Sequence, residues 1–239
     1  MYRWYVIFLL MAQPKANKLE LWVRARTSEQ KAQRRQEILE AAYKLFHDLG
    51  YEQASLNRIA REARLSKTSI GLYFQTREEV FMEIFFKTFR DWFGKTIAAI
   101  EALDDCASVR DVAEAWMDVS WHHERLRAIA PLVAISIEYN VSDGCLAACL
   151  RLKQAECERL RQVLNRFVAV DQSQMWDLFL FAFSLYSQFV GYEKNKGFDV
   201  AMKHPDLTWM KRDYRSMLAN LLTLFLEDLK FNQNGKNGE

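Results

Sequence analysis

The chain has 239 residues, half of them hydrophobic, which is enough for a sizeable core in one large or two smaller domains. Its 8 Gly and 3 Pro are few for a loop-rich or all-β protein, and long runs of helix-forming residues favour an all-α fold. Residues 1–77 carry 14 Lys and Arg against 7 Asp and Glu, whereas the remainder carries 19 against 24. A basic N-terminal third suits a polyanionic partner, although ordinary surface charge is the alternative.

An apolar run from Tyr5 to Ala12 opens the chain. It is too short to span a bilayer, which needs about 20 apolar residues. One preceding basic residue and a poor cleavage site make it a weak signal peptide. We expect residues 1–24 to be a disordered extension, or the start codon to be placed too early, with Met11 as the true start.

A first helix is predicted over about residues 28–49. The sequence TSEQ at 27–30 has the pattern of a capping box, and Gly50 supplies a stop. Apolar residues recur at helical spacing in between, so one face is buried. These residues are Ile38, Leu39, Ala42, Leu45 and Phe46.

Two short helices follow. Ser55 caps the second helix, the break comes at Arg64 and Leu65, and Ser66 caps a third helix that reaches about Phe74. Two short helices joined by a tight turn form a helix-turn-helix, whose second helix enters the major groove of DNA. Any capped amphipathic hairpin is the neutral alternative.

The stretch SKTSIGLYF at 66–74 fits a groove-reading helix. Its first residues are small or basic, so Lys67, Thr68 and Ser69 can donate hydrogen bonds to base edges or phosphates. Tyr73 can present its hydroxyl to the DNA backbone. The apolar residues Ile70 and Phe74 pack inward.

The remainder of the chain reads as further helices. TREE at 76–79 opens a fourth helix, and 171–193 is apolar almost all round, so it should be covered on most sides. The expected helices are 77 to about 93, 109–121, 126–139 with Pro131 near its first turn or at a break, 143–168, 171–193 and 206–230, with a disordered tail at 231–239.

The four cysteines form no C-x-x-C pair. They are Cys106, Cys145, Cys149 and Cys157. Free thiols in a reducing cytoplasm are the simplest interpretation. His122 and His123 are adjacent, so their side chains point about 100° apart on a helix and do not chelate a metal as an i, i+4 pair would. We expect no metal, no cofactor and no enzymatic activity, because no catalytic constellation is present.

The run GYEQASLNRIAREARLSKTSIGLYFQTREEVF, from Gly50 to Phe81, carries a family resemblance. Together with its flanks, over residues 28–93, it resembles the DNA-binding domain of the tetracycline-repressor (TetR) family of bacterial transcriptional regulators. The resemblance implies that Ser55 and Arg77 contact phosphates and that Lys67 to Tyr73 read the groove. Arg34 and Arg35 are weaker candidates, which a solvated helix face explains nearly as well.

Two residues depart from the family pattern. Arg64 stands where the family usually has the Gly of a left-handed turn, so either the turn differs or Arg64 tolerates the strain while contacting phosphate. Gly71 stands where the family commonly has an aromatic residue, which removes one possible contact or lets the helix sit deeper; drift within a subfamily explains it equally well.

The resemblance also implies the layout of the whole chain. A DNA-binding domain would occupy residues 25–76, and a helical domain for effector binding and dimerisation would occupy 77–230. The helices at 171–193 and 206–230 would form the homodimer interface; a fully internal helix is the competing explanation for the first.

Aromatic residues of the second domain are candidates for an effector pocket, although plain core explains each of them better. They are Trp116, Trp121, Tyr139, Trp176, Phe179, Phe183 and Tyr186. The implied function is a homodimeric, ligand-responsive regulator, most often a repressor, on a near-palindromic DNA operator. The alternative is a helical ligand-binding dimer that has lost operator recognition.

Overall fold

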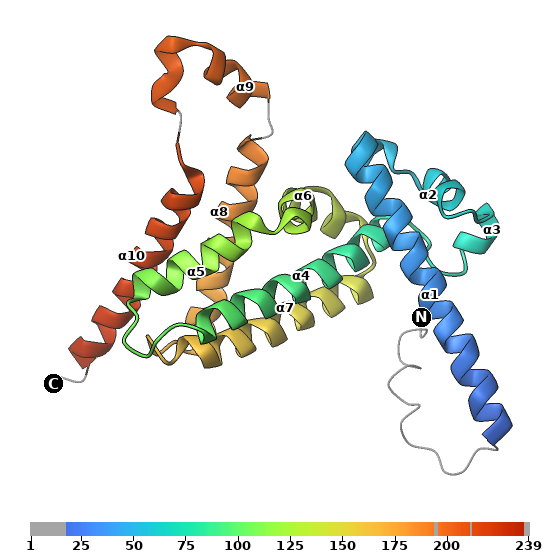
Figure 1. Ribbon diagram of the computed structural model, residues 1–239, viewed down its shortest axis with the longest axis horizontal. Helices are drawn as coiled ribbons and strands as arrows, with labels where there is room; N and C mark the ends of the chain where they lie inside the picture. The colour runs from blue at the N-terminus through green and yellow to red at the C-terminus, as the bar shows by residue number, and fades with distance from the viewer. Residues whose placement is uncertain (1–17, 194–195, 211, 237–239) are drawn as a thin grey trace. The chain divides into compact units, whose positions relative to one another are not determined.

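The computed structural model describes residues 18–193, 196–210 and 212–236, and within these ranges every regular element is helical (Figure 1). The predicted all-α fold is confirmed. The chain divides into two compact units between Gln75 and Thr76. We call residues up to 75 unit 1 and residues from 76 unit 2.

Unit 1 is a small helical domain. It contains α1 (Lys18–Leu49), a 3-10 turn (Tyr51–Gln53), α2 (Leu56–Glu62) and α3 (Lys67–Ile70). The apolar face predicted for the first helix supplies much of the core, since Ile38, Leu39 and Ala42 are buried. Two short helices cannot hold together alone, so α1 provides the surface on which they fold.

The start of α1 differs from the prediction. The helix begins at Lys18 and runs through residues 27–30, so the predicted capping box there is wrong, and residues 18–24 are helical rather than part of a disordered extension. No Gly or Pro interrupts the sequence between Pro14 and Gly50, and Ser or Thr costs little inside a helix. The expected extension before residue 18 lies outside the described residues.

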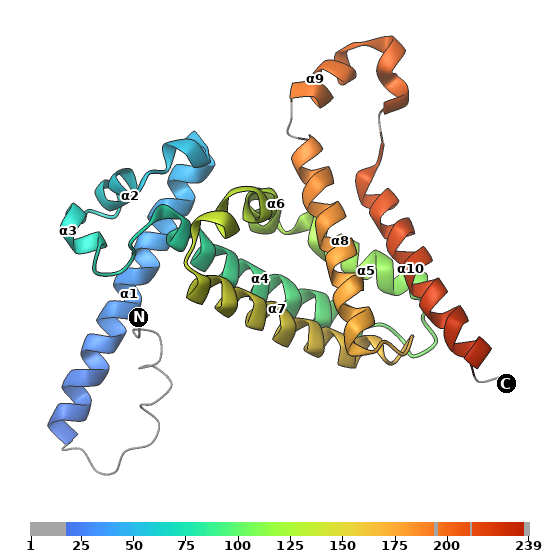
Figure 2. The same ribbon diagram turned by 180° about the vertical axis from the view of Figure 1, so that it is seen from behind.

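Unit 2 is a larger helical assembly. Its helices are α4 (Arg77–Glu101), α5 (Val109–His122), α6 (Glu124–Leu132), α7 (Asp143–Leu164), α8 (Gln172–Glu193), α9 (Lys196–Lys203) and α10 (Tyr214–Lys236). Figure 2 shows α7 and α8 in front of α4 and α5, with α10 beside α8. None of the described helices is long and apolar enough for a membrane crossing.

Several helices of unit 2 begin or end at other residues than predicted. Helix α4 continues through Gly94, because the buried face resumes at Ile97 and outweighs the roughly 1 kcal/mol that an interior Gly costs. The predicted helix at 126–139 breaks near Pro131, which has no N–H to continue the ladder, into a π-helical turn (Val133–Ile137) and a 3-10 turn (Glu138–Asn140).

The C-terminal part also differs. Helix α7 ends at Leu164 rather than 168, and α9 was not predicted. The last helix begins at Tyr214 rather than 206, because the side chain of Asp213 accepts the backbone N–H of Ser216 at 3.0 Å and caps it. It continues to Lys236, so the expectation of a disordered tail is wrong for 231–236; the last three residues lie outside the described ranges.

The core of unit 2 is built on one face of α4. The ring of Phe89 lies 5.8 Å from that of Phe179 on α8, and Phe85 lies 6.2 Å from Phe183. These tilted and edge-to-face pairs add to the large apolar area that each ring buries. Helix α8 is buried at six positions, which recur every three or four residues and form one stripe facing this core.

Ser120 joins three helices at the centre of this core. Its hydroxyl accepts the indole N–H of Trp92 on α4 at 2.9 Å and donates to the carbonyl of Trp116 on its own helix at 2.8 Å. Its carbonyl accepts the hydroxyl of Tyr186 on α8 at 2.7 Å. Burial raises the pKa of Tyr186 well above its usual value, so this phenol stays a donor.

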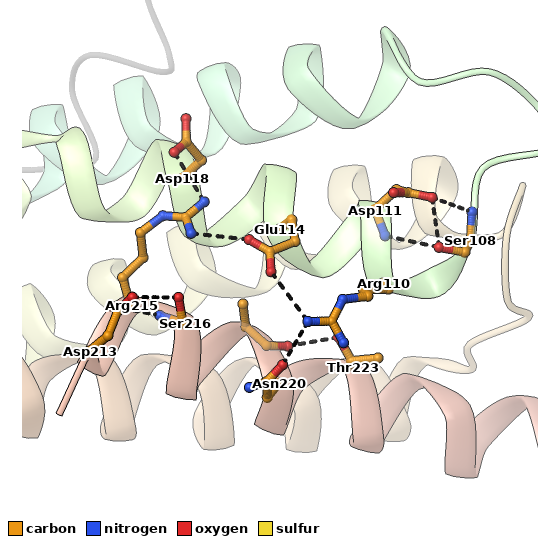
Figure 3. Close-up of polar contacts among 11 residues, drawn as sticks. Ser108, Arg110, Asp111, Glu114, Asp118, Asp213, Arg215, Ser216, Asn220 and Thr223 are labelled. Carbon is orange, nitrogen blue, oxygen red and sulfur yellow. Dashed lines mark hydrogen bonds and ion pairs between the residues drawn. The ribbon is translucent and has the colours of Figure 1, made fainter.

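A polar seam connects α5 to α10 (Figure 3). The guanidinium of Arg215 pairs with Glu114 and with Asp118, both at 3.1 Å, and Arg110 donates to Asn220 at 3.1 Å. These groups are partly exposed, so they fix the register of α10 rather than drive its packing.

Replacing Arg215 by Met should lower the free energy of unfolding by about 1 kcal/mol, because two partly screened ion pairs are lost. Urea unfolding at fixed protein concentration measures this, with the exposed Arg212→Met as the control. The difference should shrink in high salt; an effect that is independent of salt would assign Arg215 a packing role instead.

Candidate nucleic-acid interface

The turn between α2 and α3 is a Schellman motif with Arg64 at its left-handed position. The φ of Arg64 is 57°, its N–H donates to the carbonyl of Arg61 at 3.0 Å, and the N–H of Leu65 donates to the carbonyl of Ala60 at 2.8 Å. The turn therefore keeps the geometry that favours glycine, and Arg64 tolerates the strain of roughly 1 kcal/mol.

Ser66 starts α3 as predicted. Its hydroxyl accepts the N–H of Ser69 at 3.1 Å and also bonds to the hydroxyl of Ser69 at 2.8 Å. Both side chains are thus engaged in the cap. Lys67 and Thr68, which follow the cap, are exposed, whereas Ile70 is buried.

The third helix is shorter than predicted and ends at Ile70 instead of Phe74. The N–H groups of Leu72 and Tyr73 bond three residues back, to Ser69 and Ile70, which tightens the chain into a turn. Gly71 has φ −62°, and an added Cβ would meet the carbonyl oxygen of Thr68 at 3.4 Å, an ordinary contact. The fold therefore does not require glycine at this position.

Arg35 anchors the end of this segment. Its guanidinium lies 4.2 Å from the centre of the buried Phe74 ring and donates to the carbonyl of Tyr73 at 3.2 Å. Arg34 pairs with Glu37 at 2.5 Å. Both arginines are held by protein groups, so the interpretation of α1 as a solvated and structural face fits them better than phosphate binding.

Three cations along the turn have no such partners. Arg61, Arg64 and Lys67 are exposed, and in the described part of the chain none of their side chains makes a hydrogen bond or ion pair. By contrast, Glu62, which follows Arg61 in the chain, forms an ion pair with Lys44. Sequence reasoning missed Arg61, although the three-residue spacing of these cations was a usable signal.

The other predicted DNA contacts are more strongly tied to the protein. Ser55 caps α2 by accepting the N–H of Arg58 at 3.4 Å, and Tyr73 is half-buried. Arg77 belongs to unit 2, where it opens α4 and bonds to Glu78 at 2.8 Å. Thr76 caps the same helix by accepting the N–H of Glu79 at 3.1 Å.

The aromatic pocket candidates of unit 2 separate into groups. Trp116, Phe183 and Tyr186 are among the residues that line a void too small for a water molecule. The indole N–H of Trp116 has no hydrogen-bond partner among the described groups, although it is fully buried. Phe179 stacks on Phe183 at 5.4 Å, and Trp121 meets Tyr186 edge-on at 6.3 Å.

A second, open cavity of about 320 Å³ lies between α7 and α8. Trp176 is the only one of the seven aromatic candidates that lines it, along with Leu150, Gln154, Cys157, Glu158, Gln172 and Met175. Tyr139 is 81% exposed and lines neither of these two spaces. The break after α6 places it on the surface.

The described histidines and cysteines do not gather into a metal-binding group. His123 accepts the N–H of Leu126 through Nδ1 at 3.2 Å and bonds to Asp91 through Nε2 at 2.9 Å, while His122 is exposed. In the described ranges, no three His, Cys, Asp or Glu residues are grouped to hold a metal ion. All four cysteines are free thiols.

Comparison with known proteins agrees with this architecture. The sequence profile of bacterial regulatory proteins of the tetR family matches residues 38–84, and that of the tetracyclin repressor-like C-terminal domain matches residues 87–230. The chain belongs to the tetR family of bacterial regulatory proteins. The two profile matches fall on the two units, apart from the start of α4.

Individual tetR-family relatives are distant. The chain is 35% identical over 68 residues to the uncharacterized HTH-type transcriptional regulator YhgD of Bacillus subtilis (strain 168), a match that covers 28% of this chain and 36% of the relative. It therefore spans about a third of the length of this curated relative.

Solved structures share the fold at low identity. The regulator PfmR from Thermus thermophilus is 20% identical, with a TM-score of 0.50 over 80% of this chain and 97% of its own. The fatty acid degradation regulator FadR from Bacillus halodurans is 15% identical, with a TM-score of 0.53 over the same shares.

Replacing Arg64 by Gly should raise the free energy of unfolding by about 1 kcal/mol, because glycine adopts the left-handed region without strain. Urea unfolding measures the change. Arg64→Ala is the matched control, since it removes the same charge but keeps the strained Cβ. Equal stabilisation in both variants would assign the gain to charge removal instead.

Proposed function

We propose that this protein is a homodimeric, ligand-responsive transcriptional repressor of the bacterial cytoplasm that binds a near-palindromic operator. The observation that carries the proposal is the row of unpaired cations Arg61, Arg64 and Lys67 beside the exposed start of α3. Unpaired charges gathered at one turn of a helix-turn-helix favour a polyanion as their partner. The family membership supports the same function.

The DNA contacts divide by chemistry. The cations Arg61, Arg64 and Lys67 would bind phosphates, which fixes the register of the protein on the duplex. Thr68 would face base edges from the exposed side of α3. Ser66 and Ser69 would contribute less than the sequence suggests, because their hydroxyls already cap the helix.

Apolar side chains on α8 and α10 support dimerisation. Leu224 is 62% exposed and Phe231 is 76% exposed on α10, and Leu180 is exposed on α8. The rings of Phe181 and Phe225 lie 5.3 Å apart and join the two helices next to these residues. A second copy of the chain would cover them and would set the two α3 helices one DNA turn apart, about 34–36 Å.

The core of unit 2 supports effector binding. Trp116 has an unpartnered N–H, and its side chain helps to line a small void with other aromatic side chains. A flat apolar effector with a hydrogen-bond acceptor would satisfy this donor if the core opened around it. The effector would act through α4, which follows unit 1 in the chain and packs on α5, and it must prefer one of two arrangements to shift DNA affinity.

Lys67→Ala and Arg61→Ala should each weaken DNA binding without lowering the melting temperature. Each should reduce the slope of log affinity against log salt by about 1, because one phosphate contact is lost. Binding to the DNA upstream of the gene is measured by gel shift at several salt concentrations with competitor DNA. Lys203→Ala, at an exposed lysine on α9 outside the proposed dimer helices, is the charge-matched control.

If competitor DNA abolishes binding of the wild-type protein, and if the affinity varies with salt but not with DNA sequence, operator recognition is contradicted. It would favour the alternative, a helical ligand-binding dimer without a specific operator. Unchanged DNA binding in the Lys67 and Arg61 variants would remove these two residues from the interface.

Leu224→Glu should convert the dimer to a monomer without lowering the helix content, because a charge is placed at the apolar contact between subunits. Light scattering after size exclusion measures the mass. Leu150→Glu, at a similarly exposed leucine on α7, is the control and should leave the mass unchanged. A wild-type protein that is monomeric at micromolar concentration would contradict the dimer.

A further inference from the structure

The exposed side of the 66–74 segment carries one large apolar side chain. Leu72 is 72% exposed, whereas the other apolar anchors of the segment, Ile70 and Phe74, are buried. Gly71 beside it has no side chain. Leu72 therefore stands without a bulky neighbour before it, in a segment that also exposes Lys67 and Thr68.

Exposure of a single leucine is ordinary on a protein surface. The position of Leu72 is what gives it meaning, because the proposed function places this segment in the major groove. A leucine there cannot bond to phosphates or to the polar base edges. The apolar group that the major groove offers is the C5-methyl of thymine, which distinguishes T·A from C·G.

The backbone conformation around Leu72 also favours contact with the C5-methyl group of thymine. Leu72 bonds through its N–H to Ser69 and lies within a tightened turn that Arg35 anchors through Tyr73 and Phe74. Its Cα is therefore held in place. Because Gly71 contributes no side chain at the preceding position, the chain can approach base edges closely there.

We propose that Leu72 is a specificity-determining residue that contacts the C5-methyl group of a thymine in each operator half-site. The inference rests on the proposed function, since it needs α3 in the major groove. It goes further by naming which base is read and by which side chain.

The test uses the full chain and a DNA duplex that it selects from a randomised pool. Each thymine of the selected duplex is replaced in turn by deoxyuridine, which removes only the methyl group. For the wild-type protein, one thymine in each half-site should lose about fourfold in affinity on replacement, the effect of removing one buried methyl. For Leu72→Ala, the same replacement should have no effect.

Leu49→Ala is the matched control, because Leu49 is another exposed leucine of unit 1. It should keep the wild-type response to deoxyuridine, and melting temperatures should be unchanged in both variants. The same deoxyuridine response in Leu72→Ala and in wild type would overturn the assignment but leave operator binding intact. Failure of the wild type to select any sequence would instead contradict the proposed function, and with it this inference.

Discussion

Burial of one face of α4 is the constraint on which unit 2 depends. Phe85 and Phe89 on that face pack against rings of α8, and Trp92 reaches Ser120 on α5. Helices that share one buried surface move together, because a packed core does not deform continuously. A change in the aromatic core would therefore be felt along α4, down to the residues that follow unit 1 in the chain.

The same core contains a buried hydrogen-bond donor that has no partner among the described residues. Most buried polar groups in proteins find a partner, and each exception asks for an explanation. The N–H of Trp116 is such an exception among the described residues, and the Trp116 side chain helps to line a small void with Phe183 and Tyr186. The effector of the proposed function would supply the missing acceptor for this donor.

In unit 1 the strained backbone of Arg64 points to a functional role for this residue. Arg64 keeps a left-handed turn that glycine would form at lower cost, and it presents an unpaired cation there. Residues held in unfavourable backbone regions gather at functional sites. The neighbouring Arg35 shows the opposite outcome, since its charge is engaged by Phe74 and by the backbone of Tyr73.

The local signals in the sequence were sufficient for much of this structure. Ser55, Ser66 and Thr76 cap the helices that they were expected to cap, because a cap depends on residues three positions apart. The capping pattern at 27–30 gave a wrong helix start because it is equally local. A pattern of four residues cannot report that the chain before it is already helical.

The sequence by itself determined the all-α class and the pair of short capped helices, since these follow from periodicity and caps. Only the tertiary structure decided which side chains remain available. It engaged Arg35 through Tyr73 and Phe74, left Arg61 and Leu72 exposed, and placed Tyr139 on the surface. Availability depends on what packs beside a residue, and those neighbours come from distant parts of the chain.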